Sequence, residues 1–444
     1  MEQFGRLRSD FGGLVTALAL GLGSWNLVRA DAPTSRLELT VDAGRFDRVQ
    51  TPVQISIQKD EIPQDWADWL DPIATKGGQV TFKDLDNPGQ TVVAQVDRPE
   101  AQIDHVRLLW ILPARTSAGA RRTFRLEPGT PPTDPPVVWR FETTSEGHLE
   151  LFRSDDPVFR YNMAPVRHPD HPNPNQPRSA YIHPAFAPSG ALVTGDYSAE
   201  SHPHHRGFFL AYTKTSVGDL QPDFWNIQNG SGKIHFDRLG PVTTGPVSAR
   251  FSTFHRWEAS RPDNDPVVVL RERWDVEVFD IPGTPYRLFD LTSTQQATET
   301  PLVLPPYRYG GMAYRGPDSF LPQGVLDVLT SEGLDRVAGD QQPARWVDLT
   351  GPVTEGSDRY AGAAMFDHPT NLHHPTPARI HPTRIPFFCF VPSHDESVTI
   401  GTESPVVFRY RVLIHDGHPN EALNERGWRD FAESPTVSLT IRSS

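Results

Sequence analysis

Short segments in which apolar and polar residues alternate recur along most of this chain. Near the N-terminus, positions 36–41, 53–57 and 122–126 alternate with a period of two, and 106–112 is a denser apolar run. A period of two is typical of a β-strand that buries one face. The pattern predicts a small β-sandwich built from short strands.

Strand patterns also occupy the rest of the chain. They lie at 149–153, 157–162, 208–213, 267–279, 363–366 and 406–414. Few helices are expected, and the candidates are 63–70 and 420–433. The 44 prolines and 33 glycines agree with many strands joined by turns. The interpretation is an all-β protein whose large antiparallel β-sandwich carries long loops, with the functional site on one face or at one end.

A proline-rich segment separates two predicted domains. Residues 128–136, Pro-Gly-Thr-Pro-Pro-Thr-Asp-Pro-Pro, have the composition of a linker. A chain of 444 residues is also too long for one ordinary domain. We therefore expect a small N-terminal β-sandwich domain at 31–136 and a large β-sandwich domain at 137–444.

Residues 1–30 have the pattern of a secretory signal peptide. Arg6 and Arg8 precede the apolar run 14–20, and Val28-Arg29-Ala30 has small or apolar residues at the positions that a signal peptidase recognises. The apolar run is short for a transmembrane helix, and no later segment reaches its length. An uncleaved anchor is the alternative. The expected protein is secreted or periplasmic, with no membrane span once the signal peptide is removed.

The charge and cysteine content narrow the class of protein. The chain has 42 Lys and Arg against 55 Asp and Glu, a net charge of −13. Nucleic-acid-binding proteins usually carry a positive charge or a basic stripe, so no nucleic-acid partner is expected. The one cysteine, Cys389, has no partner for an internal disulfide. A secreted chain without disulfides fits a bacterial periplasm or cell envelope better than a eukaryotic secretory route.

The densest group of chemically active side chains lies at 200–207, directly ahead of the strand pattern at 208–213. Histidine titrates nearest neutral pH, and arginine binds carboxylates and other planar anions. A proline and a glycine in this segment predict a rigid turn. The alternative is a polar turn in a chain that has 17 histidines. The catalytic candidates, three for acid–base chemistry and one for anion binding, are His202, His204, His205 and Arg206.

Several other loops carry residues that suit sugar binding. An aromatic ring stacks on the C–H face of a pyranose while amides and carboxylates pair with its hydroxyls. Trp225 beside Asp223 has this character, although a tryptophan at a strand end can also be a core residue. The tract 373–384 adds His373, His374, Arg379, His381 and Arg384. The substrate-binding candidates are His183, Asp223, Trp225, Tyr314, Arg315, Asp367, His368 and Arg384.

A metal site is an alternative to acid–base chemistry on the same turn. His-x-His can place two imidazoles on one side, and His183, His368 or Asp196 would supply a third ligand. The sequence has no cysteine-based zinc spacing, no His-Glu-x-x-His and no Gly-x-Ser-x-Gly. We therefore predict no cofactor and keep a divalent metal as the alternative.

Seven motifs occur in an order that is found in one known family. They are His202-Pro203-His204-His205-Arg206-Gly207, Asp223-Phe224-Trp225, Gly310-Gly311-Met312-Ala313-Tyr314-Arg315, Arg345-Trp346-Val347-Asp348-Leu349-Thr350-Gly351, Asp367-His368-Pro369-Thr370-Asn371, Phe408-Arg409-Tyr410-Arg411 and His415-Asp416-Gly417. Over about 152–417 the chain resembles the secreted bacterial proteins labelled "PmoA family" or "methane oxygenase PmoA". Ser201 departs from the pattern, because an aspartate usually precedes the first histidine there.

The family label does not describe a function for this chain. A particulate methane monooxygenase subunit spans the membrane several times, and this sequence has no such spans. Members of the family are commonly encoded near sugar oxidoreductases and glycan-degrading enzymes, which implies a role with carbohydrates. The large domain is also similar, by analogy of folds, to the β-supersandwich of sugar mutarotases.

Three functions follow from these residues. The leading hypothesis is a secreted carbohydrate-active enzyme, a lyase, hydrolase or epimerase, that acts on a sugar or glycan fragment by histidine acid–base chemistry. The second is a carbohydrate-binding protein without catalysis. The third is a metal-dependent hydrolase or oxygenase. In each case the expected partner is a carbohydrate or another small molecule.

Overall fold

The structure is a computed structural model, and it describes most of the chain. The described ranges are 33–75, 77–98, 102–128, 139–168, 173–198, 202–262, 264–383 and 385–443. The predicted signal peptide at 1–30 and most of the predicted linker at 128–136 lie outside these ranges. The prediction of an all-β fold is confirmed, because strands make up 50% of the structure and helices 8%.

The N-terminal strands form a seven-stranded antiparallel sheet within the described residues. Its order is β28 (Thr436–Arg442), β1 (Arg36–Asp42), β8 (Arg121–Glu127), β4 (Gly78–Asp84), β5 (Thr91–Asp97), β6 (His105–Ile111) and β3 (Pro52–Gln58). The predicted helix at 63–70 is found as α1 (Gln64–Ala74), which buries Trp66 and Leu70 in the core of this sheet. A short pair, β2 (Arg48–Val49) with β7 (Arg115–Thr116), lies outside it.

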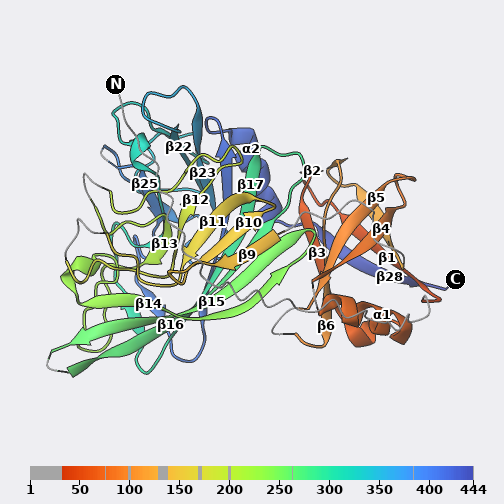
Figure 1. The fold of residues 1–444 in the computed structure, drawn as a ribbon, viewed down its shortest axis with the longest axis horizontal. Helices are drawn as coiled ribbons and strands as arrows, with labels where there is room; N and C mark the ends of the chain where they lie inside the picture. The colour runs from red at the N-terminus through yellow and green to blue at the C-terminus, as the bar shows by residue number, and fades with distance from the viewer. Residues whose placement is uncertain are drawn as a thin grey trace, which may run out of the picture. The chain divides into compact units, whose positions relative to one another are not determined.

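One strand of this sheet comes from the far end of the sequence. β28 pairs with β1 along its whole length, with Leu39 opposite Leu439 and Val41 opposite Val437. Figure 1 shows β28, coloured blue, beside β1 among the red and orange N-terminal strands. The predicted range of 137–444 for the large domain therefore includes a strand that completes the N-terminal sheet.

The middle of the chain forms two sheets that pack face to face. The nine-stranded sheet has the order β21 (Gln342–Pro343), β24 (Pro377–Ile380), β25 (Phe387–Phe390), β19 (Gly311–Arg315), β13 (Phe208–Ala211), β12 (Tyr181–Ala185), β11 (Asp156–Asn162), β10 (Leu149–Arg153) and β9 (Trp139–Thr143). The eight-stranded sheet has the order β14 (Gly232–Thr244), β15 (Ser248–Arg261), β16 (Asn264–Phe279), β17 (Tyr286–Ala297), β27 (Val406–Asp416), β23 (Tyr360–Asp367), β22 (Trp346–Pro352) and β20 (Asp327–Thr330).

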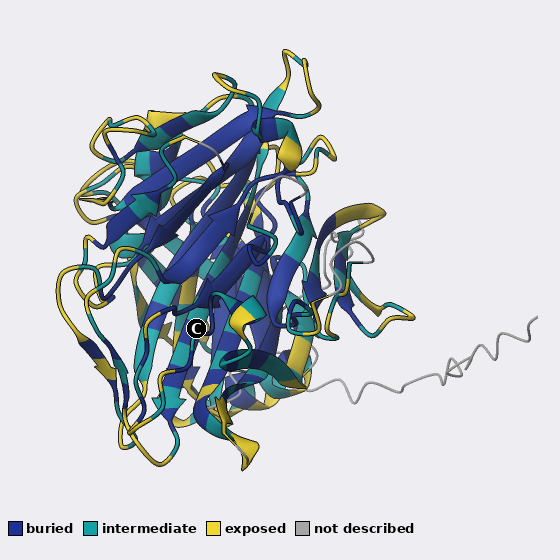
Figure 2. Cartoon of the chain, turned by 90° about the vertical axis from the view of Figure 1, so that its left-hand side faces the viewer, coloured by how far each residue is buried: buried dark blue, intermediate teal, exposed yellow. Residues whose placement is uncertain are grey.

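One continuous apolar core fills the space between these two sheets. Phe208 and Phe159 of the nine-stranded sheet contact Phe289 of the eight-stranded sheet, with ring centroids 5.8 and 5.7 Å apart. The strands are largely buried, and the exposed residues lie mainly on the connecting loops (Figure 2). Smaller elements complete the structure: β18 (Leu302–Leu304) pairs with β26 (Val398–Ile400), and single turns of 3₁₀ helix lie at Lys59–Glu61, Ile227–Asn229 and Asp318–Phe320. The predicted large antiparallel β-sandwich is confirmed.

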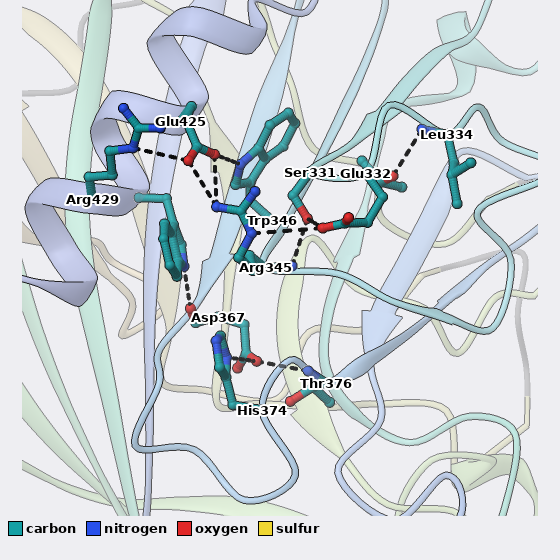
Figure 3. Close-up of polar contacts among 12 residues, drawn as sticks. Ser331, Glu332, Leu334, Arg345, Trp346, Asp367, His374, Thr376, Glu425 and Arg429 are labelled. Carbon is teal, nitrogen blue, oxygen red and sulfur yellow. Dashed lines mark hydrogen bonds and ion pairs between the residues drawn. The ribbon is translucent and has the colours of Figure 1, made fainter.

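The second predicted helix is found as α2 (Glu421–Ala432). Asn420 caps it by accepting a hydrogen bond from the Leu423 amide at 3.0 Å. Its Glu425 carboxylate accepts two hydrogen bonds of 2.9 Å from Arg345 and one of 3.1 Å from the Trp346 indole. Figure 3 shows how this carboxylate ties α2 to the start of β22. No helix in the described part of the chain is long and apolar enough to cross a membrane.

A carboxylate is buried at the centre of the sandwich. Glu272 on β16 is 2% exposed, and its two oxygens accept hydrogen bonds from five side chains. The donors are His255 Nδ1 at 2.9 Å, Trp257 Nε1 at 3.0 Å, Trp274 Nε1 at 2.7 Å, Ser293 Oγ at 2.6 Å and Gln295 Nε2 at 3.2 Å. The other imidazole nitrogen of His255 lies 2.6 Å from the Tyr161 hydroxyl. A buried charge is tolerated only when its hydrogen bonds are satisfied, as they are here.

Candidate functional site

A tight turn presents the histidines ahead of β13. His202 has a left-handed backbone (φ 57°), and Gly207 ends the turn with φ 28°. A Cβ at Gly207 would lie 2.1 Å from the backbone oxygen of Ile182 on β12. Only glycine allows this approach, so the glycine of the sequence motif fixes the turn against the neighbouring strand.

Arg206 lies beneath the turn and holds it in place. Its side chain is fully buried. Nη2 donates to the backbone oxygen of Gln176 at 2.9 Å, and Nη1 lies 3.1 Å from Asp196 Oδ1. The guanidinium also covers the Tyr197 ring, 3.4 Å from its centroid. Arg206 was predicted to bind an anion, but in this position it ties the turn to two upstream loops.

The three histidines open into a pocket of about 190 Å³. A fourth imidazole joins them, because His381 at the end of β24 lies 5.8 Å from His202 between ring centroids. Among the three histidines of the turn, the centroids are 4.7–5.6 Å apart. The pocket is lined by His202, His204, His205, Trp225, Asn226, Arg308, Tyr309, Arg379, His381 and Phe387.

The alternation of β13 decides which face of the sheet carries the pocket. Phe208 packs into the sandwich core, so the next side chain, Phe209, points to the opposite face. There Phe209 contacts Trp225, with ring centroids 4.8 Å apart, and lies 6.0 Å from His205. His205 is stacked on Phe387 of β25 at 4.4 Å. The pocket therefore sits on the outer face of the nine-stranded sheet, over an aromatic floor.

Three imidazoles of the pocket, those of His204, His205 and His381, have lowered pKa values. Burial, followed by the neighbouring His202 and Arg206, lowers the pKa of His204 to about 3. Burial and then Arg379 lower the pKa of His381 to about 4. Burial lowers the pKa of His205 well below its ordinary value. At neutral pH these side chains are uncharged and can both donate and accept hydrogen bonds.

Four predicted substrate-binding residues do not line the pocket. His183 on β12 is hydrogen-bonded to Thr194 at 2.9 Å. Asp223 accepts hydrogen bonds from the amides of Trp225 and Asn226 at 3.0 and 2.8 Å, so it positions these two pocket residues. Tyr314 is buried and donates to the Val193 oxygen. Arg315 is buried and lies 3.1 Å from Asp318. Of the predicted substrate-binding residues, Trp225 lines the pocket.

The remaining predicted residues lie elsewhere. His368 is hydrogen-bonded to Thr370 and contacts the edge of Phe431. Arg384 lies outside the described residues. Asp367, at the end of β23, is fully buried, and Figure 3 shows it beside His374 and Thr376. It accepts hydrogen bonds from His374 Nδ1 and Asn371 Nδ2 at 2.7 Å and from the Thr376 amide at 3.0 Å.

Substituting Asp367→Asn is expected to change stability and leave the pocket unaffected. An amide nitrogen would then face donors that now share the carboxylate, which costs about 1–3 kcal/mol of unfolding free energy for a buried unsatisfied group. Urea unfolding gives the stability, and calorimetry with a sugar ligand gives the affinity. A loss of affinity at unchanged stability would show instead that Asp367 acts in ligand binding.

Sequence reasoning missed part of the pocket lining. Arg308 and Tyr309 precede the Gly310–Arg315 motif, and no spacing in the sequence connects them to the histidine turn. Arg379 and His381 were noted in the tract 373–384, and Asn226 follows Trp225, but none of the three was selected as a site residue. Within the described residues, no group of three or more His, Cys, Asp or Glu side chains is arranged to hold a metal ion.

The chain matches the model of one protein family over residues 148–429, which is more than half of its length. The chain belongs to the DUF6807 family. DUF6807 is described as a family of unknown function. The matched range contains every residue that lines the pocket, and it overlaps the range of the seven motifs. The pocket is therefore a feature of the DUF6807 part of the chain. No curated protein matches the chain.

Two solved structures are similar to this DUF6807 chain. One is an α-mannosidase from Enterococcus faecalis V583, with a TM-score of 0.40 and 10% identity over 93% of this chain and 47% of that one. The other is a protein in glycosyl hydrolase family 38 from Enterococcus faecalis, with a TM-score of 0.38 and 9% identity over 93% of this chain and 48% of that one. The DUF6807 chain thus spans about half the length of these structures, and a likeness at this level carries no argument about function.

Proposed function

We propose that this protein is a carbohydrate-active enzyme that removes a proton from a carbon of a sugar ring, as a lyase or an epimerase does. The observation that supports it is the cluster of four imidazoles around a pocket with an aromatic wall. The export of the chain, from the pattern of residues 1–30, belongs to the same proposal. The resemblance to the PmoA-labelled family also supports a role with carbohydrates, because members of that family are commonly encoded near sugar enzymes.

The size and lining of the pocket suit one sugar ring. Ligand pockets commonly measure about 300–1,000 Å³, and this pocket of about 190 Å³ is smaller. Tyr309 is partly exposed and offers a ring face for the C–H side of a pyranose. Trp225 is 1% exposed and supports this ring, with the two ring centroids 5.5 Å apart. Asn226 and the neutral imidazoles supply donors and acceptors for its hydroxyls. We infer that a monosaccharide or the terminal residue of a glycan binds here.

Proton transfer is the role that we infer for the imidazoles. One neutral imidazole would take a proton from a ring carbon next to a carbonyl or carboxylate carbon. In a lyase, the electron pair of that C–H bond forms a C=C bond, the C–O bond at the next carbon breaks, and the imidazolium that took the proton passes it to the leaving oxygen, directly or through a second imidazole. In an epimerase, a proton returns to the same carbon from the opposite face.

Hydrolysis fits the pocket less well. Most glycosidases use a pair of Asp or Glu side chains on either side of the scissile bond. Among the described residues that line the pocket there is no Asp or Glu. Histidine proton transfer is therefore the chemistry that these side chains support best.

Deuterium exchange in heavy water tests this function directly. The full chain is incubated with a panel of neutral and acidic sugars and their oligomers, and incorporation at ring carbons is followed by NMR. An epimerase should incorporate deuterium at a ring carbon of at least one sugar. A lyase should instead replace the ring-carbon hydrogen by a C=C bond, which gives new ultraviolet absorbance. Sugar binding or hydrolysis with neither deuterium incorporation nor C=C formation would contradict the proposal.

A carbohydrate-binding protein without catalysis is the second candidate. The observation in its favour is the low pKa of His204, about 3, because such an imidazole is a weak base. This function predicts sugar affinity that changes little between about pH 5 and 7, since the pKa values of His204 and His381, about 3 and about 4, lie below that range. It also predicts no deuterium incorporation, so the same experiment separates the two candidates.

A further inference from the structure

Three guanidinium groups are buried near the histidine turn without lining the pocket. Arg178, Arg206 and Arg315 are 2%, 0% and 1% exposed. Arg178 and Arg206 interact electrostatically with His204, and Arg315 interacts with His205. The floor of the pocket therefore lies in the field of several buried positive charges.

Carboxylates do not fully neutralise these charges. Arg206 pairs with Asp196 at 3.1 Å, and Arg315 pairs with Asp318, whose side chain is 46% exposed. Arg178 pairs with no carboxylate of the described residues. Its Nη2 donates to the Leu210 oxygen at 2.9 Å, and its Nε and Nη1 donate to no described atom.

Arg178 keeps its charge at neutral pH in spite of this environment. Burial and, after it, the charge of Arg206 lower the pKa of Arg178 to about 9, which is still above neutrality. The guanidinium lies 4.9 Å from the centroid of the Phe209 ring but has no paired carboxylate among the described residues. Burial of such a charge costs free energy, and in low dielectric its field is weakly screened. An anion bound above it would lower this cost.

The mouth of the pocket adds two more guanidinium groups. Arg308 is exposed, and no carboxylate of the described residues pairs with it. Arg379 on β24 pairs with Asp340 and also faces the pocket. Arginine binds a carboxylate through two parallel N–H···O bonds, which the compact ammonium of lysine does not provide.

We infer that the sugar bound in this pocket carries a carboxylate, that Arg308 and Arg379 hold this carboxylate, and that the buried guanidinium groups stabilise it. The inference rests on the proposed function and narrows its substrate class to hexuronic acids. A carboxylate also acidifies the hydrogen on the adjacent ring carbon, which is the proton that a lyase or an epimerase removes.

Calorimetry with matched sugars tests the inference. Glucuronate and glucose differ only in a carboxylate in place of a hydroxymethyl group, and galacturonate with galactose and mannuronate with mannose extend the comparison. We expect the full chain to bind at least one hexuronate about tenfold or more tightly than its neutral partner, as the loss of a charge-assisted bidentate contact implies. Added salt should weaken hexuronate binding more than neutral-sugar binding.

Two variants locate the effect. Arg308→Gln is expected to lower the affinity for the hexuronate about tenfold or more, and to lower the affinity for the neutral sugar much less. Arg271→Gln is the matched control, because Arg271 is exposed on β16 of the other sheet, and it should change neither. The inference is overturned if no hexuronate binds, if the neutral partner binds as tightly, or if Arg308→Gln weakens both sugars equally.

The outcome for the substrate class is separate from the outcome for catalysis. Tight hexuronate binding with neither deuterium incorporation nor C=C formation would remove the proposed enzyme and leave this inference standing. Deuterium incorporation into neutral sugars alone, without a preference for hexuronates, would support the proposed enzyme and contradict the inference of a hexuronate substrate.

Discussion

Substituting Glu272→Ala is expected to lower the free energy of unfolding by about 3–5 kcal/mol, the usual cost of breaking a buried charge network by removing one member. The variant leaves two indole N–H groups, a hydroxyl, an amide and an imidazole in the sandwich core without their shared acceptor. Urea unfolding followed by tryptophan fluorescence measures the change.

Glu258→Ala is the matched control for this prediction. Glu258 lies on β15 of the same sheet, but its partners Arg256 and His235 are partly exposed, with 36% and 29% of their side chains accessible. We expect its loss to change stability by no more than about 1 kcal/mol, as for most exposed ion pairs. Equal effects of the two substitutions would show that the buried network is not the source of stability.

The same network makes stability depend on acid pH. Burial raises the pKa of Glu272, but hydrogen bonds from His255, Ser293 and Trp274 outweigh it and hold the pKa below its ordinary value of 4.5. Such a carboxylate stabilises the fold above its unfolded pKa, and the contribution is lost as the pH falls through the lowered, folded value. Glu272→Gln should remove this part of the acid dependence.

Substituting His204→Ala is expected to lower kcat by about 100-fold or more on the sugar that shows deuterium incorporation, because general acid–base groups contribute about 10²–10⁴-fold. His204 is a better position for this test than His205. The His205 ring is stacked on Phe387, so its loss would also disturb packing. Steady-state kinetics gives kcat and KM separately, and thermal unfolding checks that the fold is intact.

His418→Ala is the control for the loss of a histidine. The His418 side chain is 62% exposed and pairs with Asp327, and it does not line the pocket. Its substitution should leave kcat and KM unchanged. If His204→Ala also retains full turnover, the assignment of acid–base chemistry to this turn is wrong.

The strands were predictable where hydropathy alternates and were missed where polar side chains are buried. The predicted strand at 267–279 is found within β16, and 406–414 within β27. β15 was not predicted, although it has 14 residues. Its inward face includes Thr253 and His255, which are buried because they join the Glu272 network. Buried polar residues of this kind interrupt the alternation of apolar and polar positions by which a strand is predicted from its sequence.

The site was predictable only where its residues are contiguous. His202, His204 and His205 stand within four positions, so their proximity follows from the sequence itself. Arg308 and His381 come from loops far away in the sequence, and the pairing of β13, β19, β25 and β24 brings them to the same pocket. Asp367 is a chemically suitable site residue by type. The three hydrogen bonds that its oxygens accept depend on the folded structure and cannot be predicted from the sequence.

The pairing of β1 with β28 has a consequence for how the fold is reached. Arg442 donates to Glu38 across 404 positions of sequence, so the N-terminal sheet cannot be completed by its own segment of chain. Long-range pairing of this kind slows folding, and until it forms, β1 presents an open edge with Leu37, Leu39 and Val41 on its apolar face. A fragment that ends before residue 436 would keep that edge open and would be prone to aggregate.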